Sequence, residues 1–210
     1  MNSQGNALLA TILPAYGPCD HFSGVCQEMG WNPPAGHVPR GFCGALGSSD
    51  EVELVLVTAE PGDPLPGEVH TGLESAVTTS IEGLRNRVTP FHRNVRLILD
   101  LCFPGQSFEE QLRRTWRTNS VLCSAQIEGG SMPRPIEDIC IQTYLRKQLA
   151  LMPNALVAAL GGKAQNRLRR HGIKFFPAVH PSSRISTPAK HASWRALAEE
   201  LNSRRRSKQQ

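Results

Sequence analysis

A histidine stands where an apolar segment of this chain ends, and polar residues follow it directly. The stretch FFPAVHPSSR begins with apolar residues at Phe175 and turns polar at His180. An imidazole in such a place can donate, accept or transfer a proton near neutral pH. Ser182, Ser183 and Arg184 add hydroxyl and guanidinium donors behind it. By itself the pattern is equally that of a surface loop, so its meaning depends on what lies beside it.

Two further side chains that could take part in a reaction lie at or directly after apolar runs. Glu60 comes after VELVLVTA, and a carboxylate can position or deprotonate a water molecule. Asn119 lies in TNSVLC and offers both a carbonyl acceptor and an NH2 donor. Each has a structural alternative: Glu60 as a turn or capping carboxylate, and Asn119 as an amide bonded to the backbone at a strand start.

The elements that must position these groups read as alternating strands and helices. Apolar, β-branched runs predict strands, and amphipathic runs with acidic starts and basic ends predict helices. The predicted strands are 52–58, 118–123, 155–160 and 173–179, and the predicted helices are 72–86, 91–102, 107–116, 135–152, 161–171 and 190–205. This alternation predicts a three-layer α/β/α fold with a central, four-stranded, mainly parallel sheet.

Such a sheet brings the candidate groups together. In open α/β sheets, ligands bind beyond the carboxyl ends of the strands. Glu60, Asn119 and His180 follow or lie at three of the predicted strands. We therefore expect all three on one binding edge.

Composition and organisation limit the classes of function. The 210 residues, with 40% hydrophobic and 20% charged residues, are typical of one globular domain. No apolar run reaches the roughly 20 residues that span a bilayer, and no signal-peptide pattern opens the chain, so we expect an intracellular protein. Residues 1–50 read as an irregular segment packed on a domain at 51–205, and 206–210 as a basic tail. The net charge of +5 weakly favours a polyanionic partner, and no Gly-rich phosphate loop of a nucleotide-binding protein is present.

Six cysteines in a reducing compartment argue against a disulfide framework. Cys102 falls in a helical apolar pattern and reads as a core thiol, whereas Cys43 lies in a Gly-rich turn and is open to several readings. Four others remain, namely Cys19, Cys26, Cys123 and Cys140.

Three segments, in this order, resemble the motifs of the uracil-DNA glycosylase superfamily. VLVTAEPGDP resembles its first motif, a strand that runs into a Pro-Gly turn. TNSVLC resembles the strand whose asparagine reads the uracil edge, and VHPSSR resembles the His-Pro-Ser motif whose loop enters the DNA minor groove. The similarity covers about residues 50 to 205 and is closest to the iron–sulfur branch, often called family 4.

The iron–sulfur branch implies a [4Fe–4S] cluster. Its cysteines on the Asn-bearing strand and in the next helix correspond to Cys123 and Cys140, and its N-terminal pair to Cys19 and Cys26. The N-terminal pair departs from the branch, because it has C-x6-C spacing where the branch has C-x2-C. Cys43 is the replacement if one of that pair is no ligand, and four buried thiols without metal are the alternative.

The resemblance also implies roles in breaking the bond between base and sugar. His180 would stabilise the charge that develops on the departing base, and Glu60 would handle the attacking water and favour the cationic sugar. Asn119 would match the N3–H donor and O4 acceptor of uracil, a pattern that cytosine reverses. The branch reads Gly-Glu-Ala-Pro-Gly, whereas Thr58-Ala59-Glu60-Pro61-Gly62 carries its acid one position later.

The resemblance identifies less directly the residue that stacks on the flipped base and the residues that contact DNA. The phenylalanine that the family places between Asp63 and Gly72 is missing, so His70 is its substitute, with Phe42 as another possibility. Candidates for phosphate, groove and wedge contacts are Gly62, Ser182, Ser183, Arg184 and Ile185. Six basic residues are further candidates for positive charge facing DNA, although each alone is more typical of a solvated helix position: Lys163, Arg167, Arg169, Arg170, Lys190 and Arg195.

The resemblance thus predicts a monomeric, monofunctional glycosylase that flips out and hydrolyses uracil from DNA. The unusual first motif and stacking residue keep a second reading open, a glycosylase for hypoxanthine or xanthine. A third reading is a non-catalytic protein that binds damaged or single-stranded DNA.

Overall fold

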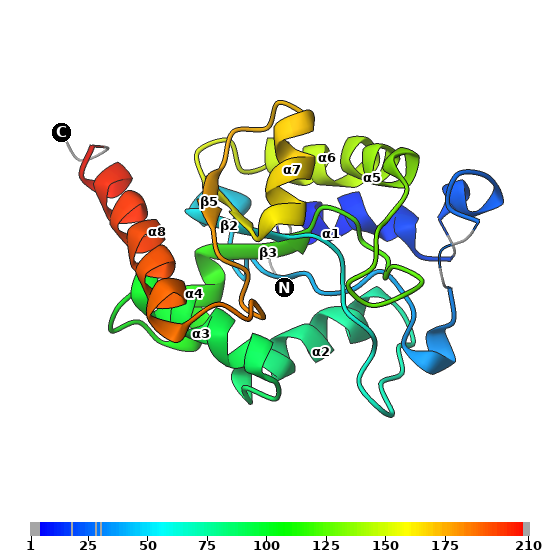
Figure 1. Cartoon of the computed structure of the whole chain (residues 1–210), viewed down its shortest axis with the longest axis horizontal. Helices are drawn as coiled ribbons and strands as arrows, with labels where there is room; N and C mark the ends of the chain where they lie inside the picture. The colour runs from blue at the N-terminus through cyan, green and yellow to red at the C-terminus, as the bar shows by residue number, and fades with distance from the viewer. Residues whose placement is uncertain (1–4, 18, 28, 30, 208–210) are drawn as a thin grey trace.

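The sheet at the centre of the molecule has five strands in the order β1-β3-β2-β4-β5. The computed structural model describes residues 5–17, 19–27, 29 and 31–207 (Figure 1). The strands are β1 Cys43–Gly44, β2 Leu54–Thr58, β3 Thr115–Asn119, β4 Leu156–Leu160 and β5 Phe176–Ala178. The predicted α/β fold with a mainly parallel sheet is confirmed, because β2, β3, β4 and β5 run parallel. The additional strand is β1, which pairs antiparallel with β3 and is too short to leave a sequence pattern.

Helices flank the sheet close to where the amphipathic patterns predicted them. They are α1 Gly5–Ile12, α2 Leu73–Arg85, α3 Pro90–Cys102, α4 Phe108–Arg113, α5 Arg134–Cys140, α6 Arg146–Ala150, α7 Gly162–Arg170 and α8 Thr187–Ser207. A π-helical segment, Ile141–Leu145, joins α5 to α6, so the predicted helix at 135–152 is one continuous element. Ser107 caps α4, since its side chain accepts a hydrogen bond from the backbone N–H of Glu110.

One predicted strand lies earlier in the chain than the sequence suggested. We expected it at 118–123, whereas β3 begins at Thr115 and ends at Asn119. Parallel pairing explains the shift, because Leu54 to Thr58 of β2 fix the register against Thr115 to Asn119. Asn119 is therefore the last residue of its strand, and the helix predicted to reach 116 ends at Arg113.

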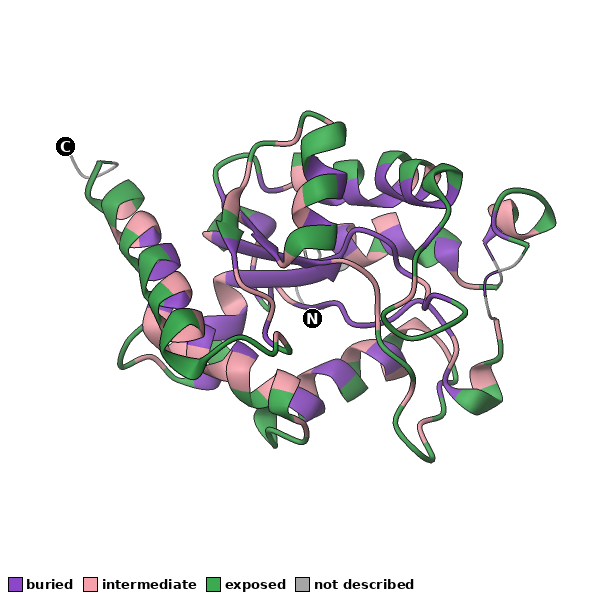
Figure 2. Ribbon diagram, in the orientation of Figure 1, coloured by how far each residue is buried: buried purple, intermediate pink, exposed green. Residues whose placement is uncertain are grey.

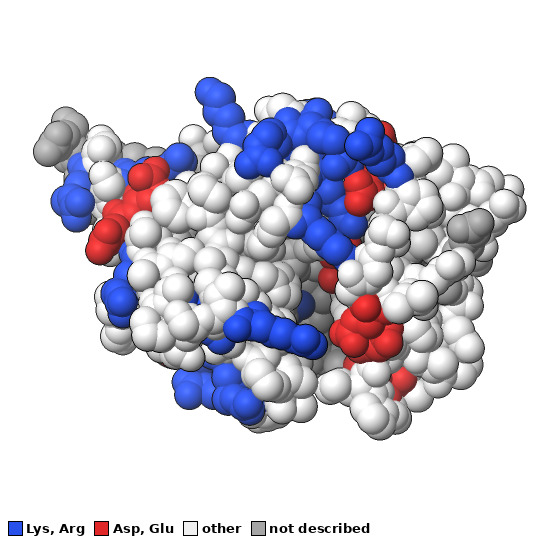
Figure 3. All heavy atoms as spheres, viewed as in Figure 1, with Lys and Arg blue, Asp and Glu red and all other residues white. Residues whose placement is uncertain are grey.

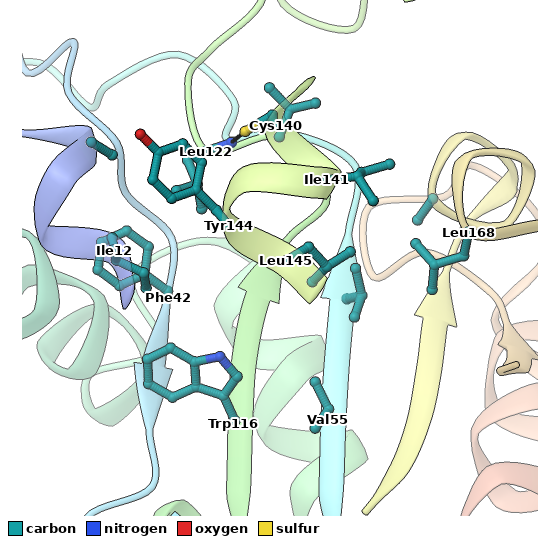
Figure 4. Close-up of a cluster of buried hydrophobic side chains, with 14 of the residues drawn as sticks. Ile12, Phe42, Val55, Trp116, Leu122, Cys140, Ile141, Tyr144, Leu145 and Leu168 are labelled. Carbon is teal, nitrogen blue, oxygen red and sulfur yellow. Dashed lines mark hydrogen bonds between the residues drawn. The ribbon is translucent and has the colours of Figure 1, made fainter. Parts of the chain in front are cut away.

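Alternate residues of β2 supply two hydrophobic cores. Leu54 and Leu56 pack with apolar side chains of α3, α4 and α8, and Val55 and Val57 pack with those of α1, α5 and α7. Figure 2 shows the strands buried between these layers, and Figure 4 shows the second core around Val55. Each buried Leu or Val contributes about 1.5–3 kcal/mol, so both faces anchor the strands.

The N-terminal segment packs on the sheet domain, whereas part of the predicted C-terminal tail belongs to the last helix. Leu8 and Ile12 of α1 are fully buried in the core on the α5 side, so the N-terminal segment is packed onto the sheet domain. Of the expected tail, Arg206 and Ser207 belong to α8, and residues 208–210 lie outside the described part. Among the described residues, no helix is long and apolar enough to span a membrane.

Candidate functional site

A large cleft opens at the carboxyl edge of the parallel strands. Its volume is about 1210 Å³, and Glu60, Asn119 and His180 all line it. The three residues follow or end β2, β3 and β5, which run in the same direction, so their ends share one edge. Figure 3 shows a hollow in this face with basic side chains on two sides and acidic ones beside it.

His180 is held in one orientation by its own loop. Its Nδ1 accepts a hydrogen bond from the backbone N–H of Ser182 at 3.1 Å, so in the neutral ring the proton lies on Nε2. The preceding residue, Val179, is bonded to α8 through Ser193 Oγ at 3.0 Å and Trp194 Nε1 at 2.9 Å. The sequence thus delivers an Nε2–H donor on a fixed backbone.

The surroundings keep His180 uncharged. Burial lowers the pKa of His180, Arg117 and Lys163 lower it further, and Glu60 opposes them. Gly161 makes room for the ring: its φ is +89°, and a Cβ there would lie 2.8 Å from the Cβ of His180. A neutral imidazole with a free Nε2–H is therefore the form present at neutral pH.

Asn119 is 2% exposed, and its amide is oriented by two neighbours. The Thr58 hydroxyl donates to Oδ1, and Nδ2 donates to the carbonyl of Arg40 at 2.9 Å. Gly41 passes close over the amide with φ +82°, and a Cβ there would lie 2.7 Å from Nδ2. One lone pair on Oδ1 and one N–H on Nδ2 remain for a ligand.

Glu60 is fixed between two cations. Lys163 Nζ lies 2.8 Å from Oε1, and Arg167 Nη1 lies 2.5 Å from Oε2. The contact with Arg167 is a charge contact without hydrogen-bond geometry, because Oε2 has no hydrogen-bond donor among the described residues. Oε2 is itself buried, although the Glu60 side chain lines the cleft and is 7% exposed.

The same contacts change the expected roles of two basic residues. Arg167 is 2% exposed and also bonds Glu137 at 2.7 Å and Ser120 at 3.1 Å, so it is a buried bridge. The expectation that it faces DNA is wrong for this reason. Lys163 lines the cleft and ties Glu60 to the carbonyl of Gly129 at 2.9 Å.

The structure brings a different aromatic residue to the cleft from those expected. His70 is buried against Glu68 at 2.7 Å, and Phe42 is fully buried against Trp116, so neither lines the cleft. Phe91, in the first turn of α3, does line it, with its ring centroid 5.8 Å from that of His180. The sequence signal for it was the TPF helix start, whose Thr89 cap places Phe91 at the helix end near the cleft.

Arg117 is a second cleft residue that sequence reasoning missed. It precedes Asn119 by two positions on β3, so both side chains lie on the same face of the sheet. Arg117 is 7% exposed, and its Nε and Nη1 have no hydrogen-bond partner among the described residues. The available signal was a charged residue inside the buried run TWRTN.

The residues expected to contact DNA lie at the mouth of the cleft. Gly62, Ser182, Ser183 and Arg184 line it, and Ile185 is 46% exposed beyond it. Asn94 Nδ2 donates to the carbonyl of Pro181 at 2.7 Å, which ties this loop to α3.

Away from the cleft, four cysteines share a small cavity of about 20 Å³. Cys19, Cys26, Cys123 and Cys140 all line it. Cys43 does not, because it lies on β1 beside Arg117, and Cys102 lies in the opposite core. The replacement role considered for Cys43 is therefore not supported.

Three of the four thiols around this cavity have raised pKa values. Burial raises the pKa of Cys140 to about 12, and mutual repulsion adds to burial in raising the pKa of Cys26 and Cys123, so without metal these remain thiols. Cys140 Sγ accepts from the backbone N–H of Leu122 at 3.4 Å (Figure 4), and Tyr144 Oη lies 2.9 Å from Cys19 Sγ. No three His, Cys, Asp or Glu of the described segments are placed to hold a single metal ion.

Comparison with known families agrees with the site. The sequence model of the uracil DNA glycosylase superfamily matches residues 73–202, more than half of the chain. The match includes Phe91, Arg117, Asn119 and His180, and it begins after Glu60. No curated protein matches the chain. The fold, the shared cleft and the family match agree: the chain belongs to the uracil DNA glycosylase superfamily.

Proposed function

We propose that this protein flips uracil out of DNA and hydrolyses the bond between the base and deoxyribose, leaving an abasic site. The observation that carries the proposal is the placement of Glu60, Asn119 and His180 on one cleft. All three come from one chain, so the proposal is for a monomer that needs no partner subunit.

His180 acts on the departing base. When the C1′–N1 bond breaks, its electron pair stays on the base and charge spreads to the carbonyl oxygens. The Nε2–H of His180 donates to such an oxygen, a contact that strengthens as the charge grows and so lowers the barrier. Because the ring is neutral, it stabilises the anion by a hydrogen bond, and the base takes its proton from solvent after release.

Glu60 acts on the sugar side. The carboxylate positions the attacking water and favours the positive charge on the oxocarbenium-like sugar. The water oxygen bonds to C1′, and the displaced proton passes to solvent. Lys163 and Arg167 keep the carboxylate in place, and Lys163 is occupied by Glu60 and the Gly129 carbonyl. This supports a monofunctional enzyme, because Lys163 serves as a clamp for the carboxylate.

Asn119 and Phe91 select the base. The free acceptor and donor positions of Asn119 match uracil N3–H and O4, whereas cytosine would place donor against donor. Phe91 offers its ring as the stacking surface, and such contacts contribute about 1–3 kcal/mol per base. Ile185, Ser183 and Arg184 fill the gap in the duplex, offsetting unstacking, which costs a few kcal/mol.

We propose further that Cys19, Cys26, Cys123 and Cys140 bind a [4Fe–4S] cluster. When bound, such a cluster would cross-link the N-terminal segment to α5 and to the segment that follows β3; its cavity lies away from the cleft, and the cluster would supply no step of hydrolysis. Anaerobically purified protein should contain about four iron and four sulfide per chain. Cys140→Ser should lose iron, whereas Cys102→Ser, equally buried in the other core, should keep it. Iron-free wild-type protein would refute the proposal.

The test of the main function is abasic-site formation on a uracil oligonucleotide. His180→Ala should lose excision, whereas His191→Ala, in α8 outside the cleft, should retain it. Equal excision by His180→Ala and wild type would remove His180 from the mechanism. Binding of the oligonucleotide without any abasic product would instead indicate a non-catalytic DNA-binding member.

A deaminated purine is the second candidate substrate class. The observation that favours it is Arg117, which adds unpaired donors to the cleft beyond what uracil needs. Parallel assays with uracil, hypoxanthine and xanthine oligonucleotides decide between these substrates.

A further inference from the structure

The charges in the cleft are unequally compensated. The carboxylate of Glu60 faces two cations, Lys163 and Arg167. The guanidinium of Arg117 lines the same cleft and has no acidic partner within salt-bridge distance among the described residues. A buried arginine without an acidic partner lowers the stability of the fold, so its presence in the cleft indicates a functional role.

Burial lowers the pKa of Arg117 and Cys43 opposes that shift, but a guanidinium stays protonated in proteins. The thiol of Cys43 accepts a hydrogen bond from it, and burial raises the pKa of Cys43, which keeps that thiol neutral. The ring of Phe91 lies under the guanidinium, with Cζ 5.0 Å from the centroid. His92 is also neutral, since burial, and then Arg117, lowers its pKa to about 4. One positive charge is therefore directed at the cleft floor beside the base reader Asn119.

We propose that Arg117 determines the substrate class of the cleft, favouring bases that depart as anions and rejecting bases that carry positive charge. The inference rests on the proposed glycosylase function and deepens it. The class comprises lactam bases such as uracil, hypoxanthine and xanthine. Cationic alkylated purines, which leave as neutral molecules, fall outside it.

The physical reason lies in when the charge acts. A fixed cation in a water-poor site needs no reorganisation as the C1′–N1 electron pair moves onto the base. It interacts little with a neutral base in the ground state and strongly with the departing anion, so it lowers the barrier for that class. Arg117 Cζ lies 5.0 Å and the His180 ring centroid 5.8 Å from the centroid of Phe91, so the charge and the Nε2–H donor border the same part of the cleft.

The test compares leaving groups. Single-turnover excision of uracil and of 5-fluorouracil, whose anion is more stable, is measured for wild type, Arg117→Gln and Arg117→Lys. Arg117→Gln should lose on the order of 100-fold with uracil, and the loss with 5-fluorouracil should be roughly tenfold smaller because that anion needs less help. Arg117→Lys should keep the wild-type ratio of the two rates, since it keeps the charge.

Arg96→Gln is the matched control. Arg96 also stacks on an aromatic ring, with Cζ 4.1 Å from the centroid of Phe108, and also has an unpartnered Nε, but it lies outside the cleft. Its substitution should leave both rates unchanged. Equal losses by Arg117→Gln on both substrates, or no loss on either, would overturn the inference.

Two further readouts separate a charge effect from a folding defect. The acid limb of the pH–rate profile should move to higher pH in Arg117→Gln, because Arg117 is one of three charges acting on His180, with Glu60 and Lys163. Binding of free 5-fluorouracil should tighten in wild type as the ligand ionises, whether or not the protein cleaves DNA. If the ionised ligand binds more tightly but no base is excised, the glycosylase function is refuted and the preference of Arg117 for anionic bases is supported. If bases are excised but ionisation does not tighten binding, the glycosylase function is supported and the role of Arg117 is refuted.

Discussion

Arg167 is a buried link between the cleft and the body of the protein, and the cost of removing it can be estimated. It bridges Glu60 and Glu137 through contacts of 2.5 and 2.7 Å, and its side chain is 2% exposed. Breaking a buried ion pair by deleting one partner costs about 3–5 kcal/mol, because a charge is left uncompensated. Here Lys163 still holds Glu60 and Arg170 still holds Glu137, so Arg167→Met should cost about 3 kcal/mol, the lower end.

Urea denaturation measures this cost. The midpoint should fall with an unchanged m-value, and Tm should drop by about 6–12 °C for a chain of this size. Arg169→Met is the matched control, because Arg169 lies on the same helix and is exposed; it has a hydrogen bond to Asn166 and a cation–π contact with Phe175, and no ion pair is found for it among the described residues. It should shift stability by about 0.5 kcal/mol or less.

A double variant tests whether the loss of stability comes from carboxylates left without their cation. Arg167→Met combined with Glu137→Gln removes one of the two stranded charges, so it should recover part of the lost stability. A destabilisation of Arg167→Met below about 1 kcal/mol, or a further loss in the double variant, would refute the bridging role. Uracil excision should fall in both variants, because Glu60 loses one of its supports.

Three other outcomes follow from the cleft. Gly161→Ala should destabilise the protein by about 1–3 kcal/mol and abolish most excision, since φ +89° and the 2.8 Å approach to the Cβ of His180 exclude a methyl group; thermal melts beside activity check this. Phe91→Leu should weaken substrate binding by about 1–3 kcal/mol at near-normal Tm, measured as KM or Kd, and unchanged binding would remove Phe91 as the stacking ring. Excision should be level at neutral pH and fall in acid through the lowered pKa of His180, because a protonated Nδ1 cannot accept from Ser182; a profile that rises in acid would contradict the neutral donor. The same lowered pKa makes the unfolded chain bind the proton more readily, so this histidine also reduces stability as pH falls below its usual range.

The family resemblance and the fold were accessible from the sequence because both depend on local patterns. The apolar run before Glu60 and the histidine after FFPAV each mark a strand end without reference to the rest of the chain, whereas Asn119 was predicted near the start of its strand and lies at the end only because of the register of β3. Parallel strands then require that their ends share an edge, so the grouping of the three residues on one cleft was predicted. The four cysteines likewise came together at one cavity, although what that cavity binds stays a proposal.

Local sequence patterns could not predict which charged side chains pair with one another. Arg167 looked like any basic residue on an amphipathic helix, yet it lies under Glu60 because α7 packs beside β2. Phe91 replaces the aromatic residue sought near His70, because the first turn of α3 enters the cleft from elsewhere in the chain.

The sequence by itself determined which apolar runs form strands and which polar groups lie at or beside them, and hence which groups meet at the cleft, since strand and helix periods are short-range properties. Only the tertiary structure decided which of those groups are paired and which are left with an unbalanced charge. Pairing depends on side chains that are far apart in sequence, such as Glu60 and Arg167. It also depends on which side chains lack a partner, as Arg117 lacks an acidic one among the described residues.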